Sequence, residues 1–156
     1  MTFRPVRNGD ADGLISLVER CFSEHPGVVV EPDGIDADLR AYATVLEKSG
    51  GEGFVLEQDD QIVALVSGVL LSAGRYQLKR IYLDSRLRGS GMGTKLLHLI
   101  ESRAAACGAA SIELWSDTRF ERAHRFYTRE GYAKTGAERA LGDLSNSIEY
   151  QFTKTL

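Results

Sequence analysis

The sequence lacks several features that would place it in a specialised class of protein. It has only two cysteines, Cys21 and Cys107, far apart in the chain, which argues against a disulfide framework or a cysteine-bound metal. No apolar run reaches the roughly 20 residues of a membrane-spanning helix, and residues 1–7 lack the apolar core of a signal peptide. We therefore expect a cytoplasmic protein without a membrane partner or a bound metal.

Dense clusters of lysine and arginine are also missing. The formal net charge is −3, and no basic block stands out, so a nucleic-acid partner is not expected. The chain has no linker, repeat or low-complexity tract. Its 156 residues suit one domain with one core, and we predict a single domain over residues 1–156.

The apolar residues that are present change their spacing along the chain, which predicts seven strands and four helices. The helical spacing covers residues 11–23, 39–48, 94–107 and 120–130, with Asp10 as the N-cap of the first helix. Strands are predicted over residues 3–6, 53–58, 61–71, 76–83, 111–115, 132–138 and 147–153. This order predicts a mixed α/β sheet with helices on both faces.

The most informative segment is the glycine-rich loop Arg88–Gly93, between the strand at 76–83 and the helix at 94–107. Such a junction offers unpaired N–H groups and the positive end of a helix dipole, which together suit a phosphate. A dinucleotide fingerprint would need glycine where Thr94 stands. A nucleotide P-loop would need Gly-Lys-Ser/Thr, and the order here is Gly93-Thr94-Lys95. Neither of these nucleotide motifs fits.

Two longer motifs resemble the GNAT superfamily of N-acetyltransferases. Arg88, Gly91 and Gly93 match the family pattern Arg/Gln-x-x-Gly-x-Gly/Ala, after the strand Leu78-Lys79-Arg80-Ile81-Tyr82-Leu83-Asp84. Downstream, residues 123–132 resemble the family's Ala-x-x-Phe/Leu-Tyr-x-x-x-Gly-Phe/Tyr helix. The resemblance covers nearly the whole chain. It implies an α/β (α+β) fold with a mixed, mostly antiparallel sheet of about seven strands, flanked by about four helices.

The resemblance implies that the glycine loop binds the pyrophosphate of acetyl-CoA, the acyl donor. It assigns the strand before the loop to the pantetheine arm and a backbone N–H near Leu83 to the thioester carbonyl. The cofactor-binding residues expected on this basis are Ile81, Tyr82, Leu83, Arg88, Gly89, Ser90, Gly91, Met92, Gly93 and Thr94.

Acetyl transfer to an amine also needs a proton for the departing CoA thiolate. The resemblance gives this role to Tyr127, which occupies the matching position in the downstream helix. Because Ala123, Phe126 and Tyr127 share an apolar face, a purely structural role for this tyrosine stays open.

Two positions depart from the family pattern. Gln77 stands where many relatives have a glutamate that serves as the general base, and Gln77 cannot take a proton at neutral pH. Glu31, Glu113 or Asp117, a water relay, or direct capture of free amine are the alternatives. Phe120 stands where relatives often have an asparagine that contacts the pantetheine.

The segment between the first two helices is acidic. Residues 24–38 contain Glu24, Glu31, Asp33, Asp36 and Asp38 and no lysine or arginine. Exposed carboxylates there would attract a cationic amine, although a solvated loop is the simpler interpretation. We predict that Glu31, Asp117 and Arg119 contact the acceptor, a small-molecule or peptide amine. The alternative function is an acyl-CoA-binding regulatory module without transferase activity. The resemblance also suggests a homodimer formed through the final hairpin.

Overall fold

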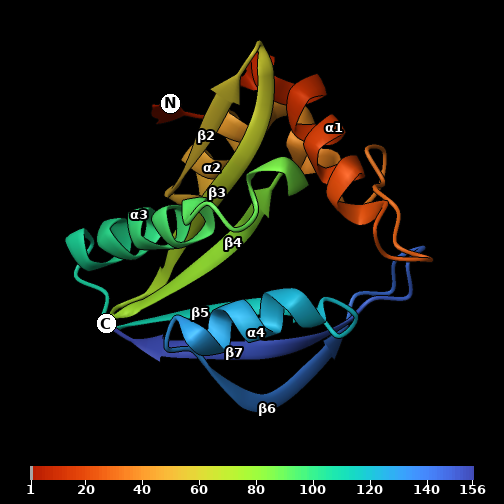
Figure 1. Ribbon diagram of the computed structural model, residues 1–156. Helices are drawn as coiled ribbons and strands as arrows, with labels where there is room; N and C mark the ends of the chain where they lie inside the picture. The colour runs from red at the N-terminus through yellow and green to blue at the C-terminus, as the bar shows by residue number, and fades with distance from the viewer. Residues whose placement is uncertain (1) are drawn as a thin grey trace.

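The computed structural model describes residues 2–156, which form one seven-stranded sheet in the order β1-β2-β3-β4-β5-β7-β6 (Figure 1). The strands are β1 (Phe3–Pro5), β2 (Gly51–Gln58), β3 (Gln61–Ser72), β4 (Arg75–Leu83), β5 (Ser111–Asp117), β6 (Ala133–Ala140) and β7 (Ile148–Thr155). Only β4 and β5 pair in parallel, and every other neighbouring pair is antiparallel. The predicted mixed, mostly antiparallel sheet is confirmed.

Four α-helices cover the sheet: α1 (Ala11–Phe22), α2 (Tyr42–Ser49), α3 (Met92–Ala106) and α4 (Glu121–Arg129). Short 3₁₀ segments lie at Asn8–Asp10, Ala37–Ala41 and Ser85–Leu87. Apolar side chains of α1 and α2 pack with β2 and β3 in one core, and those of α3 and α4 pack with β4 and β5 in another. The helices therefore lie on both sides of the sheet, as the sequence predicted.

The starts of the predicted helices differ in detail from the structure. The helix expected from residue 39 begins at Tyr42, because the 3₁₀ segment Ala37–Ala41 precedes it. The helix expected from Thr94 begins at Met92, because Gly91 turns the chain with a φ of 81° and serves as its N-cap. Asp10 does precede α1, but its carboxylate does not cap that helix. It instead accepts a hydrogen bond from the Arg7 N–H at 2.8 Å and pairs with Arg4, because a 3₁₀ turn precedes the helix.

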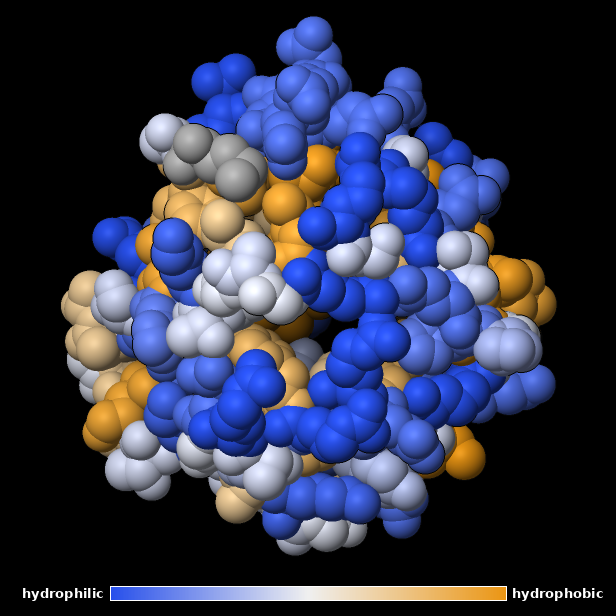
Figure 2. Space-filling model, viewed as in Figure 1, coloured by the Kyte–Doolittle hydropathy of each residue, from blue (hydrophilic) through white to orange (hydrophobic). Residues whose placement is uncertain are grey.

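The strands β4 and β5 are joined at one end only. Residues 75–77 of β4 pair with residues 111–113 of β5, and no further pairs follow. Beyond this point the two strands diverge (Figure 1). The space-filling view has a dark hollow at the same place, above α4, with a largely hydrophilic rim (Figure 2). The separation leaves the β5-facing edge of β4 without ladder partners.

A β-bulge in β4 coincides with this separation. Ser67 pairs with Arg80 and Gly68 pairs with Leu78, so Lys79 is an extra residue without an opposite partner. Side chains alternate between the faces of a strand, and an extra residue reverses the alternation. Before the bulge Leu78 packs with the α3/α4 core, whereas after it Tyr82 packs with the α1/α2 core.

Candidate functional site

The glycine loop leaves several backbone N–H groups without acceptors. Gly89 and Gly91 have φ values of 76° and 81°, a region that favours glycine. Within residues 2–156 neither of their N–H groups has an acceptor. Met92, Gly93 and Thr94 form the first turn of α3, where N–H groups have no intrahelical acceptor. Such donors, at the positive end of a helix dipole, have the character that an anion site requires.

Not every N–H of the loop is free. The Arg88 N–H donates to the Ser85 carbonyl at 3.2 Å, and the Ser90 N–H donates to the Leu87 carbonyl at 3.4 Å. These bonds shape the turn that exposes the remaining donors. Gly93 differs from Gly89 and Gly91 because its φ is not positive. A Cβ at Gly93 would lie 3.5 Å from the Phe126 ring, an ordinary contact distance, so the site has room for a small side chain.

The side chains of the loop serve the surrounding structure. Met92 is buried in the α3/α4 core. The Thr94 hydroxyl donates to Glu130 at 2.8 Å, and the Ser90 hydroxyl donates to the Leu87 carbonyl. The loop therefore presents backbone rather than side-chain groups, with Arg88 as the exception.

Arg88, at the start of the loop, forms an ion pair with Glu24, which follows α1. Its Nη1 donates to Glu24 Oε1 at 2.8 Å, and its Nη2 contacts the other carboxylate oxygen. The hydrogen bonds from Arg88 lower the pKa of Glu24 below its usual value. One of the acidic residues between α1 and α2 is thus bound to the cation of the glycine loop.

Tyr127 combines a buried ring with an unpartnered hydroxyl. The residue is 6% exposed, and its ring packs against Phe126, Tyr132 and Phe152. Its hydroxyl has no hydrogen-bond partner within residues 2–156. Among the side-chain oxygens and nitrogens of these residues, only Tyr76 Oη is both inaccessible to solvent and without a hydrogen-bond partner. The Tyr127 hydroxyl is therefore still accessible to solvent. Burial and the nearby Tyr82 hydroxyl raise the pKa of Tyr127 and keep the phenol protonated.

Three residues of β4 line the separation from β5. Ile81 and Leu83 pack against the α3/α4 core, whereas Tyr82 packs on the α1 side. The Leu83 carbonyl accepts a weak hydrogen bond from Cys21 Sγ at 3.6 Å. Their side chains serve the two cores, so the backbone edge is what β4 offers to a ligand.

Aromatic rings connect the two sides of the separation. Phe22, the last residue of α1, contacts Tyr82 of β4 at 5.9 Å and Phe120 at 6.1 Å between ring centroids. His25 lies 4.5 Å from the Phe120 ring. Phe120, just before α4, therefore packs on the segment that follows α1.

The carboxylates considered as general bases are already engaged. Glu113 accepts hydrogen bonds from Arg75 at 2.6 Å and from Gln77 at 3.3 Å, with further donors from Trp115 and Gln151. Burial opposes its ionisation, but the hydrogen bonds from Arg75 and Gln77 outweigh this effect and lower its pKa. Glu113 thus fastens β4 to β5 where they are still paired.

Asp117, Arg119 and Glu31 form part of a loop network. Asp117 accepts hydrogen bonds from the backbone N–H and the guanidinium of Arg119. Burial opposes ionisation of Asp117, but these bonds outweigh it and lower its pKa. Arg119 also donates to the Ser145 carbonyl at 2.9 Å, and Glu31 accepts from the Leu144 N–H at 3.1 Å. The network ties together the loops after α1, β5 and β6.

The remaining carboxylates of residues 24–38 also have basic partners. Asp33 pairs with Arg40, and Asp36 and Asp38 both pair with Arg80, at 3.0 and 2.8 Å. The Arg80 side chain is only 13% exposed. The sequence did not indicate this role for Arg80, although the interrupted alternation around Lys79 was a signal that its side chain changes face.

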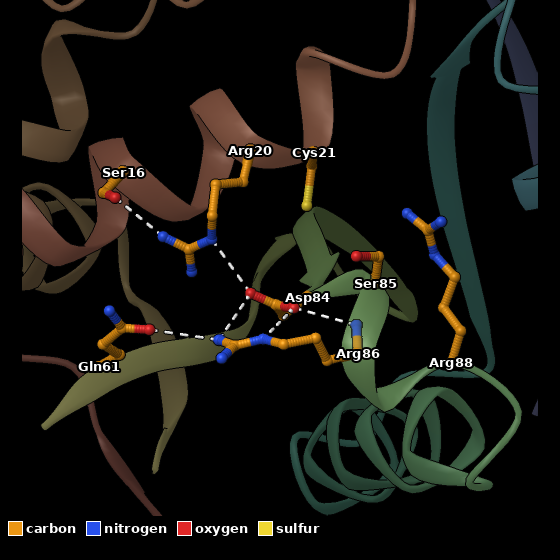
Figure 3. A pocket seen from close by; sticks show the side chains of 8 residues that line it. All are labelled: Ser16, Arg20, Cys21, Gln61, Asp84, Ser85, Arg86 and Arg88. Atoms are coloured by element: carbon orange, nitrogen blue, oxygen red, sulfur yellow. Dashed lines mark hydrogen bonds and ion pairs between the residues drawn. The ribbon is translucent and has the colours of Figure 1, made fainter. Parts of the chain in front are cut away.

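A polar pocket of about 480 Å³ lies beside the loop, between α1 and the turn at residues 84–86 (Figure 3). Arg20 and Arg86 both donate to Asp84, whose side chain is 4% exposed. Arg88 lines the same pocket but points away from this cluster (Figure 3). The hydrogen bonds from Arg86 lower the pKa of Asp84 well below its usual range. The sequence also gave no indication of this pocket.

Within residues 2–156, no group of three or more histidine, cysteine, aspartate or glutamate side chains is placed to hold a metal ion. No helix in that part of the chain is both long and apolar enough to cross a membrane.

Comparison with known proteins places this geometry among acetyltransferases. The model of the Acetyltransferase (GNAT) family matches residues 12–132. An uncharacterized N-acetyltransferase of Mycobacterium tuberculosis is 27% identical over 133 residues, covering 81% of this chain and 85% of that protein. An acetyltransferase structure from Streptococcus agalactiae has a TM-score of 0.84 at 16% identity, covering 99% and 98% of the two chains. The PaiA N-acetyltransferase of Thermoplasma acidophilum, solved with coenzyme A, has a TM-score of 0.75 at 15% identity over both whole chains.

Proposed function

Because the chain belongs to the GNAT family of acetyltransferases and is an acetyltransferase, we propose that it is an acetyl-CoA-dependent N-acetyltransferase. The acetyl group passes directly from acetyl-CoA to the primary amine of a small molecule or peptide, with both substrates bound together. The observation that carries this proposal is the set of unpartnered N–H groups at the start of α3, beside the separation of β4 and β5.

The donor is assigned to the glycine loop and the free edge of β4. The N–H groups of Gly89 and of residues 91–94 bind the diphosphate, and Arg88 adds a positive charge. The pantetheine arm runs along the unpaired edge at residues 81–83 as an added strand would. The coenzyme A in the Thermoplasma PaiA structure supports this choice of ligand.

The chemistry requires one bond to form and one to break. The amine nitrogen attacks the thioester carbonyl carbon, the C–S bond breaks, and the acetyl group becomes an amide. A backbone N–H near Leu83 polarises the carbonyl oxygen. Tyr127 gives its phenolic proton to the departing thiolate, and its raised pKa keeps that proton available at neutral pH.

The attacking nitrogen must be unprotonated. Since Glu31, Glu113 and Asp117 are each held by hydrogen-bond donors, we favour capture of the free-amine fraction from solution. The one proton that the nitrogen loses after attack restores the Tyr127 phenol through solvent, which balances the proton that Tyr127 gave to the thiolate. On this basis kcat/KM rises with pH until the acceptor amine itself is deprotonated.

The test is to incubate the purified protein with acetyl-CoA and a panel of alkyl amines, polyamines and peptides. Thiol release is followed with a chromogenic reagent, and product mass identifies the acetylated amine. We expect release with at least one amine and none without an acceptor. CoA binding without thiol release across a broad panel would support the acyl-CoA-binding module instead. No CoA binding at millimolar concentration would contradict both functions.

A further inference from the structure

The ion pair between Arg88 and Glu24 joins two segments that are 64 residues apart in the chain. Arg88 begins the glycine loop, and Glu24 follows the end of α1. Both Nη groups of Arg88 contact the Glu24 carboxylate, an arrangement that matches the way a guanidinium binds a phosphate. The side chains are 30% and 34% exposed, so solvent and ligands can reach the pair.

The same guanidinium is the side-chain cation assigned to the CoA diphosphate. A carboxylate paired with both Nη groups occupies the donors that a phosphate would use, and it places a negative charge beside the incoming anion. We propose, on the basis of the proposed function, that Glu24 limits the affinity for the acyl donor by competing with its diphosphate for Arg88.

Glu24 is held in place for this competition by its neighbours. Phe22 and His25 on either side both pack on Phe120, and Cys21 contacts the Leu83 carbonyl. The carboxylate therefore stays close to Arg88 without the entropy loss of an otherwise mobile loop. When phosphate replaces Glu24 as the partner of Arg88, the ion pair between residues 21–25 and the glycine loop is lost. The contacts of residues 21–25 with β4 and with the start of α4 remain.

The experiment compares CoA affinity in the wild type and in Glu24→Gln by titration calorimetry at low salt. The glutamine keeps the size of the side chain and removes its charge. We expect CoA to bind about fivefold more tightly to the variant. Pantetheine, which lacks the diphosphate, should bind equally to both proteins. The variant's CoA affinity should also fall more steeply with salt, because Arg88 then pairs only with phosphate.

Two controls separate competition for Arg88 from a general charge effect. Glu52→Gln removes the same charge from an exposed pair with Arg103, near the other end of α3, and should leave CoA affinity unchanged. In an Arg88→Gln background, Glu24→Gln should give no gain. A gain that persists there, a gain with pantetheine, or unchanged or weaker CoA binding in Glu24→Gln would overturn the inference. If the wild type does not bind CoA, the proposed function is overturned instead.

Discussion

The glycine loop at the start of α3 and the acidic segment at residues 24–38 meet at the Arg88–Glu24 pair, yet their polar groups are satisfied to very different degrees. The loop has N–H groups without acceptors in the described part of the chain, beside the separation of β4 and β5. In the acidic segment, every carboxylate has a donor within the protein. Because backbone N–H groups at the start of a helix that have no protein acceptor can bind an anion, the loop is the region where a ligand is expected.

The comparison also shows what charge composition fails to reveal. The sequence suggested either a solvated loop or a rim that attracts cationic amines, and the structure adds that these carboxylates accept hydrogen bonds within the protein. Arg80 neutralises two of them, and the Leu144 N–H binds a third, Glu31. We therefore expect loss of the Arg80 pairs to affect stability, and substitutions around the loop, including its partner Glu24, to affect donor binding and turnover.

The largest effect is expected from Arg80→Gln. This change leaves Asp36, whose side chain is 8% exposed, without its guanidinium partner. Losing one member of a largely buried ion pair should reduce the free energy of unfolding by about 3 kcal/mol, measured by urea denaturation. Arg40→Gln is the matched control, because its partner Asp33 is 91% exposed, and it should have no detectable effect. Equal effects of the two variants would show that the Arg80 cluster is well hydrated.

Tyr127→Phe tests the loop side of the comparison. Removing the hydroxyl breaks no hydrogen bond within residues 2–156, so folding and acetyl-CoA affinity should stay nearly unchanged. Turnover should fall about tenfold or more, because the leaving thiolate loses its proton donor. The measurements are steady-state kinetics and CoA titration. Since the pKa of Tyr127 is raised, wild-type kcat should not decline between pH 7 and 10. Unchanged turnover in Tyr127→Phe would exclude this tyrosine from the mechanism.

The loop glycines offer a graded test. Gly91→Ala places a Cβ on a residue with a φ of 81°, which costs about 1 kcal/mol of backbone strain. Relaxation of this strain should turn the N–H groups and weaken CoA binding about fivefold. Gly93→Ala fits beside the Phe126 ring at 3.5 Å and should bind CoA like the wild type. If the two variants lose affinity equally, the backbone conformation of Gly91 is not what positions the donors.

The smallest expected effect concerns Asp84, a paired carboxylate close to the loop. Its pKa is lowered in the folded protein, so its ionised form stabilises the fold above the usual aspartate pKa of about 4. That contribution is lost as the pH falls further, through the folded value. The cost of Asp84→Asn should therefore be about 0.5–1 kcal/mol larger at pH 7 than at pH 3 in urea denaturation. If the cost of Asp84→Asn is the same at both pH values, the negative charge of Asp84 does not contribute to the free energy of unfolding.

Much of the fold could be predicted from the sequence, because local patterns determine the elements. Alternation and helical spacing identified every strand and α-helix, and the glycines fixed the turn before α3. The loop was located from spacing alone, since positive φ values and a helix start depend on few neighbouring residues.

The side-chain partners could not be predicted, because they depend on contacts between distant parts of the chain. Glu24 meets Arg88 across 64 residues, and Glu31 meets Leu144 across 113. The sequence does not show whether the carboxylate of an aspartate or glutamate will have a hydrogen-bond partner in the folded protein. The parallel pairing of β4 with β5 over only residues 75–77 and 111–113 is likewise a tertiary feature that no single segment encodes.

The extra residue in β4 has a consequence for how the two layers are built. Strict alternation along the same sequence, without the bulge, would place Arg80 and Tyr82 on the side of the sheet that carries α3, and would turn Ile81 and Leu83 toward α1. Four side chains would exchange layers without a change in their identity. One residue without an opposite partner thus decides which side of the sheet these residues serve, and deletion of Lys79, which would leave Leu78 and Arg80 as consecutive pairs of Gly68 and Ser67, should keep all four side chains on their present sides.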